Sequence, residues 1–133
     1  MILVDTSIWI DLFRDKSDKL QKTLRDRIRS DIYVLCRFNQ LELLQGARGS
    51  REWQVLNDYL ATQIYLEMSE SSWREAARIF FDLRRRGITL NSAVDCCIGQ
   101  IALENNATLL HRDRDFELIA RVRPLSQEYL KWD

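Results

Sequence analysis

The sequence predicts an α/β protein in which a mostly parallel central β-sheet is flanked by α-helices. Short runs of β-forming residues alternate with helical patterns along the chain, and parallel strands joined by helical crossovers produce this order. The first run, Ile2 to Val4, is apolar at every position, which favours a strand covered on both faces. With 133 residues and no linker or low-complexity tract, we expect a single domain over residues 1–133.

The strands and helices follow from apolar periodicity, caps and breakers. Runs rich in β-forming residues predict strands at 2–4, 32–35, around 64–66 and 107–110, with Val122 at one end of a last short strand. Apolar stripes predict helices at 8–13, from Ser17 as cap to Ile28, at 39–45 before Gly46, from Ser50 through Leu60, from Ser71 to Gly87, from Asn91 as cap to Glu104, and at 116–120. The inner face of the longest helix is expected to carry Trp73, Ala76, Ala77, Phe80 and Leu83.

Composition narrows the function classes. The chain has 20 basic and 20 acidic residues and a formal net charge of zero, so any nucleic acid must be bound by a local basic patch. The first residues lack the basic region of a signal peptide, and no apolar run reaches membrane-spanning length. The three cysteines include the adjacent pair Cys96 and Cys97 and show no metal-ligand spacing. We expect reduced thiols and a cytoplasmic protein without a membrane segment.

Acidic residues interrupt apolar segments at several distant positions. Asp5 and Asp113 each follow a predicted strand, where side chains face the ligand-binding crevice of an open α/β sheet. Glu42 and Asp95 lie within predicted helices among apolar neighbours, and Asp115 follows Asp113 closely. Taken singly, Asp5 and Asp115 are explained as helix caps, and Glu42 and Asp95 as partly exposed helix charges. Taken together, they predict a site for a divalent cation, because unpaired carboxylates repel one another.

Four segments carry a resemblance to a known family. The segments "ILVDTSIWIDLF", "LELLQGAR", "AVDCCIGQIAL" and "LLHRDRDF", in this order and spacing, resemble the PIN-domain family, and the compact length is similar to that of the VapC-type toxins of toxin–antitoxin pairs. The resemblance covers essentially the whole chain. It implies a PIN fold and a Mg²⁺- or Mn²⁺-dependent endoribonuclease that cuts single-stranded or loop RNA.

The same resemblance implies roles for individual residues and partners. Asp5, Glu42, Asp95 and Asp113 match the catalytic acids, with Asp5, Asp95 and Asp113 as metal ligands. Thr6 and Asp115 match accessory positions. Related toxins are usually homodimers neutralised by a cognate antitoxin, so we expect both partners besides the RNA substrate.

The chain departs from the family pattern at two places. His111 stands where threonine or serine is common, and Asn39 and Gln40 stand where small or apolar residues are more usual. Three roles are open for His111: contact with a phosphate, tuning of a metal-bound water, or a structural hydrogen bond.

Basic and aromatic residues outside the acidic segments are candidates for RNA contact. The basic candidates are Arg14, Lys16, Arg37, Arg48, Arg51, Arg84, Arg85 and Arg86. The last three equally suit the C-terminus of a helix, where cations oppose the helix dipole. Trp9 and Trp53 suit base stacking or, given their helical spacing with Leu12 and Leu56, packing in a core or dimer.

Other functions compete with the nuclease. A catalytically inactive PIN-like RNA-binding or scaffold protein shares the pattern of the fold. An aspartate-based phosphotransferase also places an aspartate after its first strand, but its usual second aspartate is replaced by Ser7 here. A receiver-like signalling domain requires a lysine late in the chain at a strand end, and Lys131 follows no strand that the sequence predicts.

Overall fold

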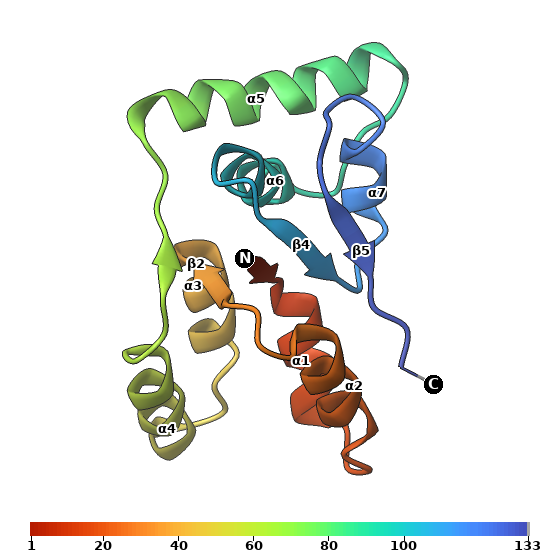
Figure 1. The fold of residues 1–133 in the computed structure, drawn as a ribbon. Helices are drawn as coiled ribbons and strands as arrows, with labels where there is room; N and C mark the ends of the chain where they lie inside the picture. Colours follow the sequence, from red (N-terminus) through yellow and green to blue (C-terminus); the bar gives the residue numbers. More distant parts are fainter. Residues whose placement is uncertain (133) are drawn as a thin grey trace.

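A computed structural model describes residues 1–132, and Figure 1 shows a central sheet with helices on both sides of it. The strands are β1 (Ile2–Val4), β2 (Tyr33–Cys36), β3 (Tyr65–Leu66), β4 (Thr108–His111) and β5 (Gln127–Tyr129). The helices are α1 (Thr6–Arg14), α2 (Lys19–Ile28), α3 (Arg37–Gln45), α4 (Ser50–Leu60), α5 (Glu70–Arg85), α6 (Val94–Glu104) and α7 (Asp115–Ile119).

The five strands form one sheet in the order β3-β2-β1-β4-β5, and every neighbouring pair is parallel. The central strand is β1, whose Ile2 lies beside Tyr33 of β2 and Thr108 of β4. The predicted α/β fold with a mostly parallel sheet is therefore confirmed. Because all strands point the same way, their carboxyl ends share one edge of the sheet, where ligands bind in folds of this type.

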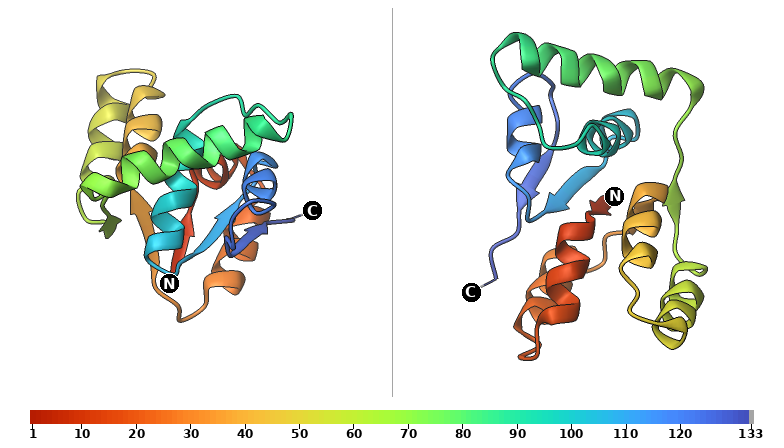
Figure 2. Two further views of the ribbon diagram at one scale, coloured as in Figure 1. Left: turned by 90° about the horizontal axis from the view of Figure 1, so that it is seen from above. Right: turned by 180° about the vertical axis from the view of Figure 1, so that it is seen from behind.

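Successive residues of β1 enter different hydrophobic cores, one on each face of the sheet. Leu3 packs in the core formed with α5, α6 and α7. Ile2 and Val4 pack in the core that includes Ile8 and Trp9 of α1 and residues of α2, α3 and α4. All three strand residues are at most 1% exposed, which explains the uninterrupted apolar run. On the first face, α5 packs across α6, as the view from above in Figure 2 shows.

The inner face of α5 differs from the predicted one. The buried residues are Ser72, Ala76, Ile79 and Leu83, whereas Ala77 is exposed and Trp73 is 57% exposed. The cause is the start of the helix. Ser69 is the N-cap, its backbone N–H donates to Ser72 Oγ at 2.9 Å, and Ser72 Oγ donates to Glu104 of α6. The polar residue Ser72 is therefore buried on the inner face of α5, where the apolar pattern predicted Trp73.

Three predicted boundaries are wrong. The N-cap of α6 is Ala93, not Asn91, and α7 begins at Asp115 with Arg114 as N-cap. The last strand is β5 at Gln127–Tyr129, five residues beyond Val122. This edge strand is only half-buried and has the sequence QEY, so it lacks the apolar pattern of an interior strand.

The cysteines and the helices bear on two composition-based expectations. Cys36, Cys96 and Cys97 are buried free thiols. Within residues 1–132, none of the helices combines the length and the apolar character that a membrane span requires.

Candidate metal centre

The acids singled out in the sequence come from five elements that meet at the carboxyl edge of the sheet. Asp5 follows β1 and Asp113 follows β4, while Asp95, Asp115 and Glu42 belong to α6, α7 and α3. The right-hand view of Figure 2 shows the end of β4 and the starts of α1 and α6 around the middle of the molecule. Distant parts of the sequence therefore supply one acidic site, which we call the acid cluster.

The tightest part of the acid cluster is formed by Asp95, Asp113 and Asp115. One carboxylate oxygen from each of them lies within 4.8 Å of the others, and all three side chains are half-buried. The turn between β4 and α7 holds two of these acids together, because the backbone N–H of Asp115 donates to Asp113 Oδ1 at 3.0 Å. Carboxylate oxygens at this spacing can share one divalent cation.

Asp5 is both a helix cap and a member of the acid cluster. Its Oδ2 accepts hydrogen bonds from the backbone N–H of Ser7 at 3.0 Å and from Ser7 Oγ at 2.7 Å, which caps α1. The side chain is only 5% exposed. Ser7 Oγ also accepts from the backbone N–H of Arg112, at 2.9 Å. Ser7, which the sequence did not single out as a site residue, thus ties the start of α1 to the end of β4.

Glu42 is connected to the start of α1 and to β2 through buried polar side chains. Thr6 Oγ1 donates to Glu42 Oε1 at 3.0 Å and accepts from Asn39 Nδ2 at 3.0 Å. Asn39 is fully buried, and its Oδ1 accepts from the backbone N–H of Cys36 at 2.9 Å. Asn39, a departure from the family pattern, therefore caps α3 and positions the Thr6 hydroxyl at once.

Burial and mutual repulsion raise the pKa values of these acids. Burial is the main cause for Asp95, whose pKa is raised to about 8, and the charges of Asp113, Asp5, Asp115 and Glu42 add to it. Burial also raises the pKa of Asp5, Glu42 and Asp115. Within residues 1–132, none of the five acids forms an ion pair; the nearby Arg112 pairs with Asp11 and Arg114 pairs with Glu117. The acid cluster is therefore a concentration of negative charge that lacks a compensating side chain.

The donor set fits a hard divalent cation. Every candidate ligand is a carboxylate oxygen, which Mg²⁺ and Mn²⁺ prefer. Softer ligands are unsuited: burial raises the pKa of the Cys36 and Cys96 thiols to about 12, and both ring nitrogens of His111 already have hydrogen-bond partners. A bound cation would also remove the repulsion among the acids.

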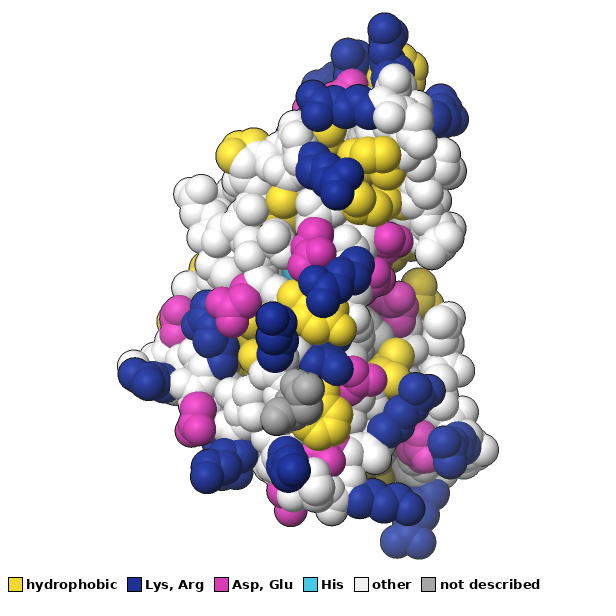
Figure 3. All heavy atoms as spheres, turned by 90° about the vertical axis from the view of Figure 1, so that its right-hand side faces the viewer, with side chains coloured by type: hydrophobic (Ala, Val, Ile, Leu, Met, Phe, Trp, Pro, Cys, Tyr) yellow, Lys and Arg dark blue, Asp and Glu magenta, His cyan; other side chains and the backbone are white. Residues whose placement is uncertain are grey.

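The basic RNA candidates lie on several separate surfaces. Arg37 pairs with Glu67 at 2.7 Å and stacks on Tyr65. Arg14 and Lys16 line a shallow hollow of about 450 Å³ after α1, and Arg48 and Arg51 are exposed around the start of α4. Arg84 and Arg85 lie over Phe80 and Phe81 near the end of α5, where Figure 3 shows Lys and Arg side chains gathered at the top of the face. These residues do not form one continuous basic patch.

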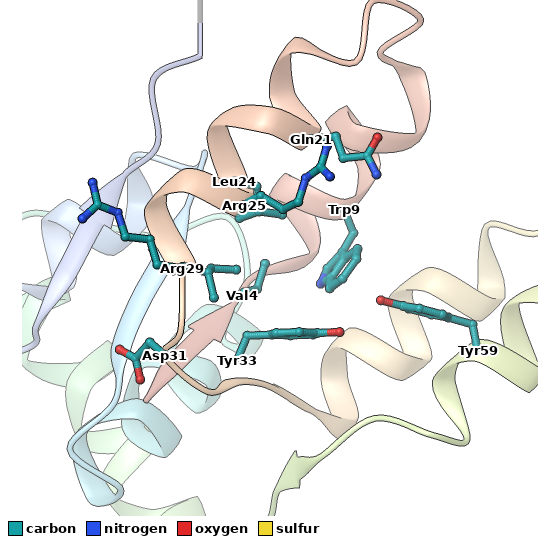
Figure 4. Close-up of a pocket in the computed structure, with 10 residues that line it drawn as sticks. Val4, Trp9, Gln21, Leu24, Arg25, Arg29, Asp31, Tyr33 and Tyr59 are labelled. Atoms are coloured by element: carbon teal, nitrogen blue, oxygen red, sulfur yellow. The ribbon is translucent and has the colours of Figure 1, made fainter.

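A hollow of about 350 Å³ lies between α1, α2 and α4, away from the acid cluster. Figure 4 shows Trp9, Tyr33 and Tyr59 around it. Trp9 is 6% exposed and packs edge-on against Tyr59 at 5.9 Å between ring centroids, which is the predicted core role. In the described part of the chain its Nε1 has no hydrogen-bond partner. Trp53 is 46% exposed.

Comparison with known proteins gives matches along almost the whole chain. The family model described as PIN domain matches residues 2–122. Two curated relatives are VapC ribonuclease Mb1587 of Mycobacterium bovis and Ribonuclease VapC11 of Mycobacterium tuberculosis. Each is 31% identical over 128 residues, which cover 94% of this chain and 96% of the relative.

Solved structures share the fold. A chain in the crystal structure of VapBC2 from Rickettsia felis, bound to a DNA fragment from their promoter, has a TM-score of 0.77 at 20% identity and full coverage of both chains. A chain of FitAcB from Neisseria gonorrhoeae has a TM-score of 0.76 at 20% identity, with 97% of each chain covered. The arrangement of strands and helices described above is therefore common to these proteins.

Proposed function

Because the chain belongs to the PIN-domain family, we propose that it is a divalent-metal-dependent endoribonuclease and the toxin of a toxin–antitoxin pair. The observation that carries the proposal is the convergence of five acids at the carboxyl edge of the sheet, none of which forms an ion pair within residues 1–132. A fold that only needed helix caps and surface charges would not require these acids to share one place. The ribonuclease names of the curated relatives support the reaction.

We assign the metal ligands to Asp95 and Asp113, with Asp5 beside them and Asp115 as an accessory acid. Mg²⁺ or Mn²⁺ bound there supplies positive charge that stabilises the phosphate as water attacks. Glu42 holds the Thr6 hydroxyl, which Asn39 fixes from the other side. The Ser7 hydroxyl donates to Asp5 and accepts from the backbone N–H of Arg112, and we assign it the structural role of joining the start of α1 to the end of β4.

The substrate class is single-stranded or loop RNA. Arg14, Lys16, Arg37, Arg48, Arg84 and Arg85 are the proposed phosphate contacts, and their dispersion suits a folded RNA that touches several surfaces. A cytoplasmic location, where such RNA is found, stays a prediction that the free thiols support.

The proposed protein partners are a cognate antitoxin and a second copy of the chain. An antitoxin that presents Arg or Lys to the acid cluster would neutralise it by replacing the metal's positive charge, and relatives of the same fold are named as VapBC complexes. An apolar face that includes Phe38, Leu41 and Trp73 supports the homodimer, because Leu41 is 60% exposed and Trp73 57% exposed.

The decisive experiment compares RNA cleavage by the parent chain and by Asp95→Asn at saturating Mg²⁺. We expect the substitution to abolish cleavage, because the amide keeps the side-chain volume but loses the charge that holds the metal. The matched control is Asp26→Asn, the same change at an exposed position on α2, which should cleave like the parent. Full activity of a folded Asp95→Asn protein would overturn the assignment. RNA binding without cleavage by the parent would favour a non-catalytic RNA-binding role.

A further inference from the structure

His111 occupies an unusual position beside the acid cluster. It is the only histidine in the chain, it ends β4, and it is fully buried. Both ring nitrogens are engaged: Nε2 lies 2.6 Å from Gln127 Oε1 of β5, and the backbone N–H of Asp113 donates to Nδ1 at 3.2 Å. The ring has no free atom to offer to a phosphate, so one of its roles considered from the sequence is not supported.

These contacts define which nitrogen carries hydrogen. A backbone N–H can only donate, so Nδ1 must be an acceptor without hydrogen. The hydrogen of the neutral ring then resides on Nε2 and is donated to Gln127 Oε1. The hydrogen bond to Gln127 therefore favours the tautomer of His111 in which Nδ1 can accept the backbone N–H of Asp113.

The ring is also fixed in place by packing. It lies 5.1 Å from the ring of Phe116 in α7 and meets the ring of Tyr129 in β5 edge-on at 5.8 Å. The backbone carbonyl of His111 accepts from the N–H of Leu130 at 2.8 Å. The position of Nδ1 is consequently determined by β4, β5 and α7 together.

We propose that His111 is a positioning residue that fixes the turn between β4 and α7 and thereby sets the spacing of Asp113 and Asp115 relative to Asp95. Three hydrogen bonds connect these residues in series. His111 Nε2 donates to Gln127 Oε1, His111 Nδ1 accepts from the backbone N–H of Asp113, and Asp113 Oδ1 accepts from the backbone N–H of Asp115. The inference rests on the proposed metal-dependent nuclease, because it concerns the geometry of those metal ligands. It assigns a functional purpose to the edge strand β5, which carries no acid of the cluster.

Two substitutions separate the role of His111 Nδ1 as a hydrogen-bond acceptor from the packing of the ring. In His111→Asn the side-chain oxygen can take the place of Nδ1 and accept from the Asp113 amide, but the residue no longer reaches Gln127. In His111→Gln the polar end reaches toward Gln127, but no acceptor stands beside the Asp113 amide. Both variants lose the ring contacts with Phe116 and Tyr129, so each is the packing control for the other.

The primary measurement is Mn²⁺ affinity by isothermal titration calorimetry, with melting temperature in chelator recorded alongside. We expect about 10- to 100-fold weaker Mn²⁺ binding in His111→Gln, the range found when a group that orients metal ligands is lost, and affinity within about threefold of the parent in His111→Asn. A purely structural role for the ring predicts the same affinity in both variants. If the parent binds Mn²⁺ and His111→Gln binds it with the same affinity, the inference about His111 is overturned but the proposed metal dependence stands. If the parent chain binds no Mn²⁺, both the proposed metal dependence and the inference are overturned.

A second measurement needs no variant. In protein labelled with ¹⁵N-histidine, the single ring should give one pair of nitrogen signals at pH 8, with the hydrogen on Nε2 and none on Nδ1. Amide exchange at Asp113 should be slow, because its N–H is held by the ring. A hydrogen on Nδ1, or an Asp113 amide that exchanges as fast as an exposed one, would overturn the proposal even if both variants failed to fold.

Discussion

Asp95 is a member of the acid cluster on which both burial and the charges of the neighbouring acids act. In an unfolded chain an aspartate loses its proton near pH 4, whereas in the folded chain burial, first, and neighbouring acids, second, raise the pKa of Asp95 to about 8. Between these two values the folded state holds a proton that the unfolded state has released. The metal-free acid cluster therefore opposes folding at neutral pH.

The first prediction concerns the pH dependence of stability in chelator. Because the folded state binds more protons than the unfolded state over this interval, the free energy of unfolding should fall as pH rises from about 5 to 8. The raised pKa values of Asp5, Glu42 and Asp115 act in the same direction. Acids with lowered pKa values, such as Asp82 beside Arg123, lose their contribution only in stronger acid, outside this window. Urea denaturation at several pH values measures the slope.

The matched variants are Asp95→Asn and Asp26→Asn. The first should flatten the slope and raise the stability of the metal-free protein at pH 8, while the second should follow the parent. A parent chain whose stability is constant from pH 5 to 8 would contradict the electrostatic description of the cluster.

At the residue scale, the sequence located the acids that directly follow a predicted strand, such as Asp5 and Asp113. It did not predict Ser7 or Asn39 as site residues, because their partners are fixed only by tertiary structure. Asn39 bonds to Cys36 three residues earlier, which a capping pattern can suggest, but also to Thr6, 33 residues away. The roles of the acids as metal ligands stay predictions for the cleavage and binding experiments.

Among the elements, α3 depends on one buried cap. Asn39→Ala would leave the N–H of Cys36 and the Thr6 hydroxyl without this partner inside the protein. An unsatisfied buried polar group costs about 1–3 kcal/mol, and we expect a loss of unfolding free energy of that size in urea denaturation. The control is Gln40→Ala on the same helix, which should change stability by less than about 0.5 kcal/mol. Equal effects of the two substitutions would contradict the role of Asn39.

A substitution at the contact between α6 and α7 is expected to stabilise the protein, whereas Asn39→Ala is expected to destabilise it. A Cβ at Gly99 would lie 3.5 Å from carbons of Ile119 and 3.9 Å from Leu125, which is ordinary van der Waals contact. Gly99→Ala should therefore stabilise the helix by about 0.5–1 kcal/mol, from the lower backbone entropy of alanine, and raise the melting temperature.

A larger side chain at the same position should do the reverse. Gly99→Leu would push against Ile119 and displace α7, which carries Asp115, so both the melting temperature and Mn²⁺ affinity should fall. If Gly99→Ala lowered the melting temperature as much as Gly99→Leu, the packing of α6 on α7 would differ from the description above.

The elements that the sequence predicted best are those with an apolar stripe and a clear cap. The predicted start of α4 at Ser50 is confirmed, and so is the end of α3 before Gly46. The face of α5 was assigned wrongly because Ser72, a polar residue, is buried by its bonds to Ser69 and Glu104. The strand β5 escaped prediction because it is an edge strand of three polar or aromatic residues, Gln127 to Tyr129.

For the whole molecule, metal binding should be coupled to stability. A metal that binds only the folded state at 100 times its dissociation constant stabilises that state by about 2.7 kcal/mol, which raises the melting temperature of a domain of this size by several degrees. We expect Mg²⁺ to produce this increase in the parent chain and in Asp26→Asn, and much less of it in Asp113→Asn. Differential scanning calorimetry in MgCl₂ and in NaCl of equal ionic strength separates binding from screening. Equal melting temperatures of the parent in the two salts would argue against a metal site.

The central position of β1 also governs when the molecule becomes complete during synthesis. Residues 2–4 are synthesised long before Thr108 to Leu110, and until those residues have been made one side of β1 has no strand to pair with. Asp5 likewise cannot lie near Asp113 until Asp113 has been synthesised. Contacts between residues so far apart in the sequence form late, because closing so long a loop is slow. With Asp5, Asp95 and Asp113 as the proposed metal ligands, such a nuclease would be inactive toward the message that encodes it until Asp113 has been synthesised.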